Sequence, residues 1–391
     1  MAAPARRKAP PRPTLPLSAG PAANEAGGIL TISLPAIAAN YRQLARKVMP
    51  AECSAVIKAD GYGCGIDQVA ATLAEAGCKT FFVAQIEEAR RVRQRAPEAT
   101  IYVLDGFSPD AGPAFAETRS QPVINSALEL AEWDHFTSAS GWRGGFALHV
   151  DTGMNRLGLP IEEAVAIAPR IHSGNHGVTL IMSHFACSET PDHPLNAAQI
   201  AQFREIRTLY RGIPASLANS AGIFLGPLTY CDMVRPGIAL FGGNPTPRQP
   251  NPMQPVVELK ARILQLRIAA KNSTVGYGAA WTAPRDTRVA IVAAGYADGF
   301  LRATERTEAG GRQVLVAGTR CPIVGRISMD LFAVDVSALP ERAVRRGDFA
   351  TLVGGELDID TVATQAGTIS YELLTNFGPR YRRIWIENTP G

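Results

Sequence analysis

The sequence predicts an α/β protein with an N-terminal (β/α)8 barrel and a C-terminal, mostly β domain. Short apolar runs alternate with amphipathic segments, such as residues 86–95, over about 200 residues. Eight such runs favour a closed barrel of parallel strands, with an open doubly wound sheet as the alternative. After about residue 254 the chain becomes β-rich, with turns of Gly, Pro and Asp and little amphipathic helix, which indicates a second domain.

The barrel is predicted to occupy residues 36–254. Its first strand ends at a lysine, in A-V-I-K, and a glycine-rich loop, G-Y-G-C-G, follows at residues 61–65. The eight predicted strands are 55–58, 81–84, 101–104, 122–124, 146–150, 178–182, 215–218 and 238–241. In barrels of this kind, active-site residues lie where strands end and the following loops begin.

The chain outside the barrel divides into three parts. Residues 1–27 are rich in Ala, Pro, Arg and Lys and are predicted to be a disordered tail, because they bury too little apolar surface to fold. Prolines interrupt this stretch, so a tail is favoured over a cleaved targeting segment. Residues 28–35 are predicted to form a strand, and residues 255–391 the C-terminal β domain.

The net charge of +4 comes from the N-terminal tail. Removing the four bases that precede Glu25 leaves 35 bases against 35 acids. A neutral body lacks the electrostatic footprint of a protein that binds nucleic acid or an anionic membrane. No uninterrupted apolar run reaches the roughly 18 residues of a membrane span. The six cysteines form no CxxC pair, which predicts free thiols in a reducing cytoplasm.

Reactive residue types gather at the predicted strand ends. They are Lys58 at the end of the first strand, Arg156 after the fifth, His184 after the sixth, Asn219 and Ser220 after the seventh, and Arg235 and Gly237 around the start of the eighth. A lysine whose surroundings favour the neutral amine can form a Schiff base with an aldehyde cofactor. Backbone of small residues near the last two strands is where barrels bind phosphate. Together these features predict pyridoxal 5′-phosphate (PLP) as the cofactor.

Each feature has a simpler interpretation. Lys58 alone fits a snorkelling surface lysine, and His184 alone fits a hydrogen-bonded core histidine. The loop at residues 61–65 follows a strand as a dinucleotide loop does, but its spacing is GxGxG and it lacks a convincing acidic partner. Four histidines between residues 172 and 193 show no metal-ligand spacing, so no metal site is predicted.

Several motifs, taken in order, resemble those of the alanine racemase family. They are residues 55–65, 151–158, 234–242, 275–283, 295–299, 325–330 and 369–372. The resemblance runs from about residue 28 to the C-terminus. It implies a PLP-dependent homodimer with shared active sites that interconverts L- and D-alanine, either to supply cell-wall peptidoglycan or in catabolism. It also implies that the strand at residues 28–35 packs with the C-terminal domain. The alternatives are a racemase of broader specificity and a non-catalytic PLP carrier.

The resemblance assigns roles to individual residues. Lys58 would hold PLP and act as the base on one face of the substrate, and Tyr277 of the other subunit would act on the opposite face. Arg235 would face the pyridine nitrogen, supported by His184, and Arg156 would approach the phenolic oxygen and the substrate carboxylate. The phosphate would be held by Tyr62, Ser220, Gly237, Ile238 and Tyr371, with Asn219 also at the cofactor, while Met329 would bind the substrate carboxylate through its backbone N–H and Tyr296 would narrow the entrance.

Two positions depart from the family pattern. Some members carry a carbamylated lysine that positions the following arginine, but His149 stands at this place and cannot form that carbamate. Arg156 must therefore be oriented in another way, either by a neutral side chain or by a bound anion. Ser328 stands where a cysteine often precedes Met329. Since the role of Met329 uses its backbone, this change is expected to have little effect.

Overall fold

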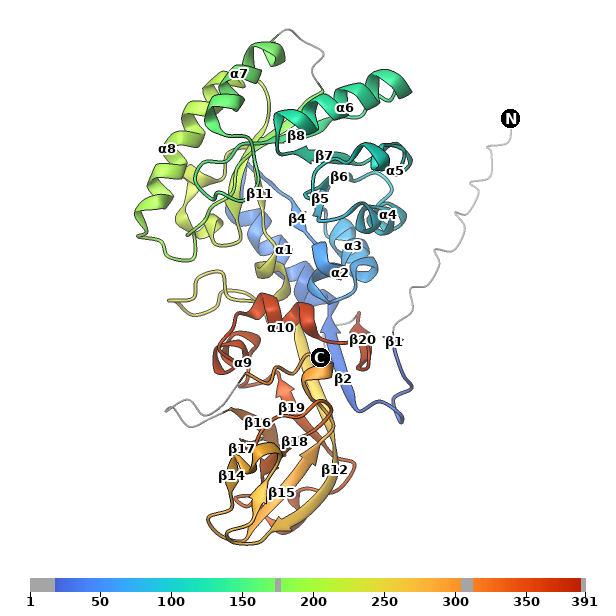
Figure 1. Cartoon of the computed structure of the whole chain (residues 1–391), viewed down its shortest axis with the longest axis vertical. Helices are drawn as coiled ribbons and strands as arrows, with labels where there is room; N and C mark the ends of the chain where they lie inside the picture. Colours follow the sequence, from blue (N-terminus) through green and yellow to red (C-terminus); the bar gives the residue numbers. More distant parts are fainter. Residues whose placement is uncertain (1–17, 173–176, 304–311, 388–391) are drawn as a thin grey trace, which may run out of the picture.

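The computed structural model describes residues 18–172, 177–303 and 312–387 (Figure 1). A barrel of strands and helices occupies the upper half of the view and a β-rich domain the lower half. The short helix α10 (Ser370–Asn376) lies between them. The predicted fold class, a barrel followed by a mostly β domain, is confirmed.

The strands of the barrel are all parallel. Their order is β3 (Glu52–Cys53), β11 (Met233–Arg235), β10 (Ala215–Asn219), β9 (Val178–Met182), β8 (Phe146–His149), β7 (Gln121–Ile124), β6 (Thr100–Val103), β5 (Thr80–Val83) and β4 (Ala55–Val56). β3 and β4 are two halves of one strand, separated only by Ser54. Since β3 pairs with β11 and β4 pairs with β5, this strand closes the sheet on itself. The hydroxyl of Ser54 donates to the carbonyl of Val234 at 2.7 Å across the closure.

Helices connect consecutive strands and cover the outside of the barrel (Figure 1). They are α1 (Leu34–Val48), which precedes the first strand, α2 (Lys58–Tyr62), α3 (Ile66–Glu75), α4 (Ile86–Arg95), α5 (Gly112–Thr118), α6 (Ala127–Ser140), α7 (Ile161–His172) and α8 (Pro194–Leu209). Inside, a separate buried cluster consists of Phe82, Tyr102, Val123, Ala147, Leu180, Met182 and Met233. These side chains come from successive strands, so the barrel is a packed core, as expected for this architecture.

The eighth strand differs from its predicted position. The sequence predicted it at residues 238–241, but the strand is β11, and Ile238–Phe241 is a 3-10 helix. Pro236 lies between the two elements and lacks the N–H that a continuing strand would use. A buried apolar run of four residues has no periodicity that separates a strand from a helical turn. Arg235 therefore lies at the carboxyl end of its strand, where barrels of this kind carry their active-site residues.

The C-terminal domain is built on a second sheet. Its strand order is β1 (Ser18–Ala19), β20 (Arg382–Ile386), β2 (Gly28–Ser33), β12 (Val257–Ala269), β15 (Thr287–Val292), β18 (Phe332–Asp335), β17 (Thr319–Val324), β16 (Gln313–Val316) and β19 (Phe349–Val353). β2 pairs antiparallel with β12 and parallel with β20, so a strand from before the barrel lies within this sheet. A small hairpin, β13 (Thr274–Val275) and β14 (Trp281–Thr282), and the helix α9 (Ile359–Gln365) complete the domain.

The predicted tail at residues 1–27 lies only partly within the described residues. Residues 1–17 lie outside the described residues, but residues 18–27 pack on the C-terminal domain. Ser18 and Ala19 pair with β20, and the guanidinium of Arg382 donates to the Pro21 carbonyl at 2.9 Å and to the Ser18 hydroxyl at 2.8 Å. These contacts need no apolar burial, so composition alone does not reveal them.

Two further findings concern the described part of the chain. None of its helices combines the length and the apolar composition that a membrane crossing requires. All six cysteines are free thiols, and four of them, Cys53, Cys64, Cys78 and Cys321, are buried.

Candidate active site

Lys58 lies where the first barrel strand turns into an unusual left-handed segment. The backbone φ angles of Ala59, Asp60, Gly61 and Tyr62 are +53°, +55°, +64° and +54°. For a residue other than glycine, this conformation costs roughly 1–2 kcal/mol. Strained backbone of this kind persists only when surrounding contacts hold it in place.

Contacts from three directions hold the left-handed segment. The Glu88 carboxylate in α4 accepts the backbone N–H of Asp60 at 3.2 Å. The Asp60 carboxylate in turn pairs with Arg91 at 2.7 Å and accepts the N–H of Ile66 at 3.1 Å. From the C-terminal domain, the indole N–H of Trp385 donates to the Cys64 carbonyl at 2.7 Å. The position of Lys58 is therefore determined by both domains.

The ammonium group of Lys58 is destabilised in this position. The side chain is half-buried, and burial, followed by the positive charge of Arg156, lowers the pKa of its amine. A lowered pKa increases the fraction of neutral amine near pH 7, and only the neutral amine is a nucleophile or a base. This environment supports the role predicted for Lys58, which stays a prediction.

Arg235 projects from the end of β11 into the barrel mouth and is buried. Its Nη1 donates to the Ser216 hydroxyl and its Nη2 to the Ser183 carbonyl, both at 2.5 Å. Burial lowers its pKa to about 10, so the guanidinium is still charged at neutral pH. Its Nε–H has no acceptor among the described residues. One donor of a fixed cation is thus free for an acceptor in the barrel mouth.

His184 contacts Arg235, as predicted. Its Nδ1 lies 3.5 Å from Nη2 of Arg235, and because arginine only donates, this nitrogen is the acceptor. Burial, and then the charge of Arg235, lowers the pKa of His184 well below its usual range. The imidazole is therefore neutral and supports the arginine without repelling it.

The turns after β10 and β11 meet two tyrosine rings. The Ser220 hydroxyl accepts the backbone N–H of Gly237 at 2.9 Å and of Ala239 at 3.3 Å. A Cβ on residue 237 would lie 2.2 Å from the hydroxyl of Tyr62, so only glycine fits there. The ring of Tyr371, from α10, lies 6.1 Å from that of Tyr62.

The hydroxyls of Tyr62 and Tyr371 have no hydrogen-bond partner in the described part of the chain. Burial raises the pKa of both phenols above the usual value, so both keep their protons. Two O–H donors and the backbone around Gly237 and the buried Ile238 therefore face the same small region. Such an arrangement of donors suits an anion, and a phosphate group in particular.

The side chain of Asn219 connects two loops at the barrel rim. Its side-chain oxygen accepts the hydroxyl of Ser188 at 2.9 Å and the N–H of Gly222 at 2.8 Å. These bonds tie the loop after β9 to the loop after β10. Direct contact between Asn219 and a cofactor stays a prediction.

Arg156 lies exposed in the loop that follows β8. The Asp151 carboxylate shapes this loop by accepting the backbone N–H groups of residues 153, 154 and 155 at 2.8–2.9 Å. At the end of β8, His149 is buried, and its Nδ1 lies 2.8 Å from the side-chain oxygen of Asn125. Asn125 directly follows β7, so the rule that site residues lie at strand ends could have identified it.

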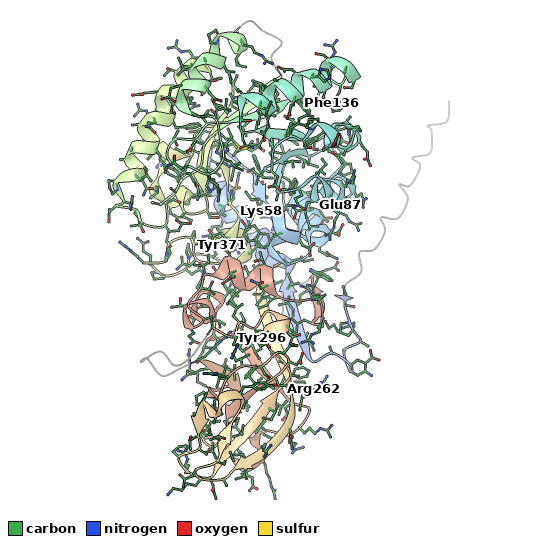
Figure 2. The ribbon with its side chains drawn as sticks, in the orientation of Figure 1. Lys58, Glu87, Phe136, Arg262, Tyr296 and Tyr371 are labelled. Carbon is green, nitrogen blue, oxygen red and sulfur yellow. The ribbon has the colours of Figure 1, made fainter. Side chains whose placement is uncertain are left out.

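The three candidates in the C-terminal domain lie apart from this group. Tyr277, Met329 and Tyr296 are 72%, 53% and 42% exposed, respectively. Figure 2 shows Tyr296 within the β domain, away from Lys58 and Tyr371. Among the described residues, no hydrogen bond or ion pair joins any of the three to Lys58. One chain therefore does not bring all predicted site residues together.

Tyr277 and Met329 nevertheless lie on one continuous face of the β domain. The backbone of Tyr296 donates to the carbonyl of Ser328 at 3.2 Å, which places Tyr296 beside Met329. Ser328 and Tyr277 both line a hollow of about 670 Å³, together with Arg326. These candidates form a second group, on a surface of their own.

Comparison with known proteins identifies the family of this fold and site. The model of the alanine racemase N-terminal domain matches residues 32–245, and that of the C-terminal domain matches residues 256–385. The chain belongs to the alanine racemase family. An alanine racemase of Methylobacterium nodulans is 52% identical over 363 residues, which cover 93% of this chain and 97% of that protein.

Solved structures of alanine racemases agree with this assignment. The crystal structure of alanine racemase from Bartonella henselae with covalently bound pyridoxal phosphate is 39% identical, with a TM-score of 0.86, and the match covers 92% of this chain and 100% of that chain. The biosynthetic alanine racemase from Pseudomonas aeruginosa is 35% identical, with a TM-score of 0.85, and the match covers 93% and 100% of the two chains. The resemblance to the alanine racemase family is therefore confirmed.

Proposed function

We propose that this protein interconverts L- and D-alanine and uses PLP that Lys58 binds covalently. The observation that carries the proposal is the position of Lys58. Its amine has a lowered pKa and lies at the carboxyl rim of the barrel, in the same mouth as Arg235 and on the side of the buried Tyr62 and the partly buried Tyr371. The family membership described above supports the same function.

The residues present fit PLP at each of its polar positions. The aldehyde would be bound by Lys58, and the pyridine nitrogen would accept the free Nε–H of Arg235. The phosphate would take the O–H donors of Tyr62 and Tyr371 and the backbone around Gly237, where a Cβ would fill the space. Bound PLP supplies an electron-withdrawing ring that makes the α-proton of an attached amino acid acidic.

The positive charge of Arg235 moderates that chemistry. Four buried groups surround the guanidinium, and its pKa of about 10 keeps it protonated at neutral pH. A permanent donor at the pyridine nitrogen discourages that nitrogen from taking a proton. The residue thereby limits how much charge the ring withdraws, which favours simple proton exchange over side reactions.

Racemisation needs a proton to leave one face of the α-carbon and another to arrive on the opposite face. The neutral amine of Lys58 is the base on one face. For the other face we assign the phenol of Tyr277, which its own chain leaves 72% exposed. A two-fold symmetric dimer can place the Tyr277 of one subunit at the Lys58 of the other, twice over. The proposed active enzyme is therefore a homodimer.

Substrate recognition is assigned to groups of the same rim and face. The exposed guanidinium of Arg156 is close enough to lower the pKa of Lys58, so a substrate carboxylate bound there would lie beside the amine. The backbone N–H of Met329 and the ring of Tyr296 would reach the site together with Tyr277. The breadth of substrates, the metabolic role and the cytoplasmic location stay predictions.

A chiral assay tests the proposed function. Purified protein with PLP should convert L-alanine into an equal mixture of both enantiomers and should do the same from D-alanine. L-serine and larger L-amino acids assayed in parallel show how broad the specificity is. If the protein binds PLP covalently but exchanges no α-proton of any amino acid into deuterated water, it is a carrier and the proposal fails.

A further inference from the structure

His149 occupies a central position in the barrel mouth and has an unusual hydrogen bond. It ends β8 and is buried, with its Nδ1 at 2.8 Å from the side-chain oxygen of Asn125. The amide of Asn125 cannot be turned around, because its nitrogen donates to the Val123 carbonyl at 2.8 Å. An amide oxygen only accepts, so Nδ1 of His149 must carry the proton.

The other ring nitrogen of His149 is then a free acceptor. Burial, and then the charges of Arg235 and Arg156, lowers the pKa of His149 to about 4, while Asp151 acts in the opposite direction. At neutral pH the ring is therefore uncharged, and Nε2 keeps its lone pair. No described residue donates a hydrogen bond to this nitrogen.

Two cations, Arg235 and Arg156, act electrostatically on His149. Nη1 and Nη2 of Arg235 already donate to Ser216 and Ser183, and its remaining Nε–H is assigned above to the pyridine nitrogen of PLP. Arg156 has no hydrogen bond or ion pair among the described residues and follows His149 by seven positions, in the loop that continues β8. A donor of Arg156 and the acceptor of His149 are complementary in type.

We propose that His149 is a positioning residue whose neutral Nε2 accepts a hydrogen bond from the guanidinium of Arg156 and aims it at the substrate carboxylate. The proposal rests on the function assigned to Arg156 above. A neutral acceptor orients the arginine without cancelling its charge. The full positive charge of Arg156 then attracts the substrate carboxylate. The same charge favours the neutral amine of Lys58, whereas an anionic partner of Arg156 would weaken this effect.

A spectroscopic experiment tests the pair without any assay of activity. In protein labelled with ¹⁵N-histidine, His149 should show a protonated Nδ1 and an unprotonated Nε2, with the His149→Gln variant identifying the signals. Arg156→Ala should move the Nε2 resonance of His149 downfield, towards that of a free acceptor, and leave Nδ1 bonded to Asn125. An unprotonated Nδ1, or an Nε2 resonance that Arg156→Ala does not move, would overturn the proposal.

A matched pair of variants tests the consequence for the reaction. The side-chain oxygen of glutamine can replace Nε2 of histidine, whereas the shorter asparagine reaches only the place of Nδ1. In His149→Gln, KM for alanine should therefore stay within about threefold of the wild-type value. His149→Asn should raise KM for alanine about tenfold or more, with a smaller change in kcat.

The same comparison in the Arg156→Ala background completes the test. If His149 acts through Arg156, His149→Asn should cause little further loss there, because the interaction is already absent. Equal losses for asparagine and glutamine, or a full additional loss in the Arg156→Ala background, would contradict the pairing. If neither the wild-type protein nor any variant racemises alanine, the ¹⁵N experiment still decides whether His149 and Arg156 are paired.

Discussion

The barrel rim around Lys58 and the face that carries Tyr277 are built in opposite ways. Around Lys58, Tyr62 and Arg235 are buried, Arg235 has several partners, and bonds from both domains hold a strained backbone. Tyr277 and Met329 are 72% and 53% exposed, and no described bond links them to the rim. The contacts of the first region form within one chain, whereas the second region presents exposed side chains, as the proposed dimer requires.

The backbone around Tyr277 shows that its exposure is not a lack of order. Gly276 and Gly278 have φ angles of +77° and +70°, which glycine adopts freely. They flank Tyr277 in the turn between β13 and β14, and both glycines lie close to Arg326. A large aromatic side chain displayed on a defined turn is typical of an interface anchor.

The largest effect should come from removing the amine of the rim. Lys58→Ala deletes both the covalent anchor and one of the two bases, so racemisation should fall by at least about 1,000-fold. Borohydride reduction followed by mass spectrometry measures the anchor separately. Cofactor that is still reduced onto the protein of this variant would show that another lysine holds it.

A smaller effect should come from the phosphate end of the rim. Gly237→Ala places a Cβ about 2.2 Å from the Tyr62 hydroxyl, so the ring must move and the affinity for PLP should fall roughly 10- to 100-fold. Adding Tyr62→Phe removes the clashing oxygen and should recover part of that loss. Gly212→Ala is the control, because its Cβ would meet no atom within 4 Å.

Equal PLP affinity for Gly237→Ala and for Gly212→Ala would mean that the ring of Tyr62 is not confined as described. Fluorescence titration of the apo protein with PLP measures each of these variants. Gly212 has a φ of +87°, so its variant also reports the cost of backbone strain alone.

The smallest effect should come from weakening the hydrogen bonds by which Glu88 supports the left-handed segment. Glu88 accepts the N–H groups of Asp60 and Ala84, whereas the neighbouring Glu87 forms a surface ion pair with Arg90. Glu88→Gln should lower the free energy of unfolding by about 1–2 kcal/mol, and Glu87→Gln by less than about 0.5 kcal/mol. Urea denaturation of the two variants compares them. Indistinguishable midpoints would show that the segment does not depend on Glu88.

The sequence predicted the rim better than it predicted the contacts that hold it. Strand periodicity and the strand-end rule were enough to find Lys58, Arg235 and His184, and the structure pairs the last two. The same rule missed Asn125, because an asparagine after a strand also fits an ordinary turn. The placement of the eighth strand was wrong, since a short buried run of apolar residues carries no periodicity.

The left-handed segment could not be predicted from local sequence. Ala59 and Asp60 prefer right-handed backbone, and the bonds that overrule this preference come from residues distant in the chain. Trp385 donates to Cys64 across 321 positions, and Glu88 accepts from Asp60 across 28. Such contacts follow from the complete fold and not from composition or spacing.

In the proposed dimer, each active site is formed by the Lys58 rim of one subunit and the exposed Tyr277 face of its partner. Lys58→Ala and Tyr277→Phe each damage one half of every site in their own homodimers. In a mixed dimer, one site collects both substitutions, and the other receives an intact Lys58 and an intact Tyr277. Random pairing makes about half of the dimers mixed, each with one good site of two.

Refolding the two inactive variants together, followed by the alanine assay, is the most direct measurement. Isolating the mixed dimer through different affinity tags shows that it has formed. The refolded mixture should regain about a quarter of wild-type activity, and the isolated mixed dimer should have about half of wild-type activity. A mixed dimer that is folded, loaded with PLP and still inactive would contradict a shared site.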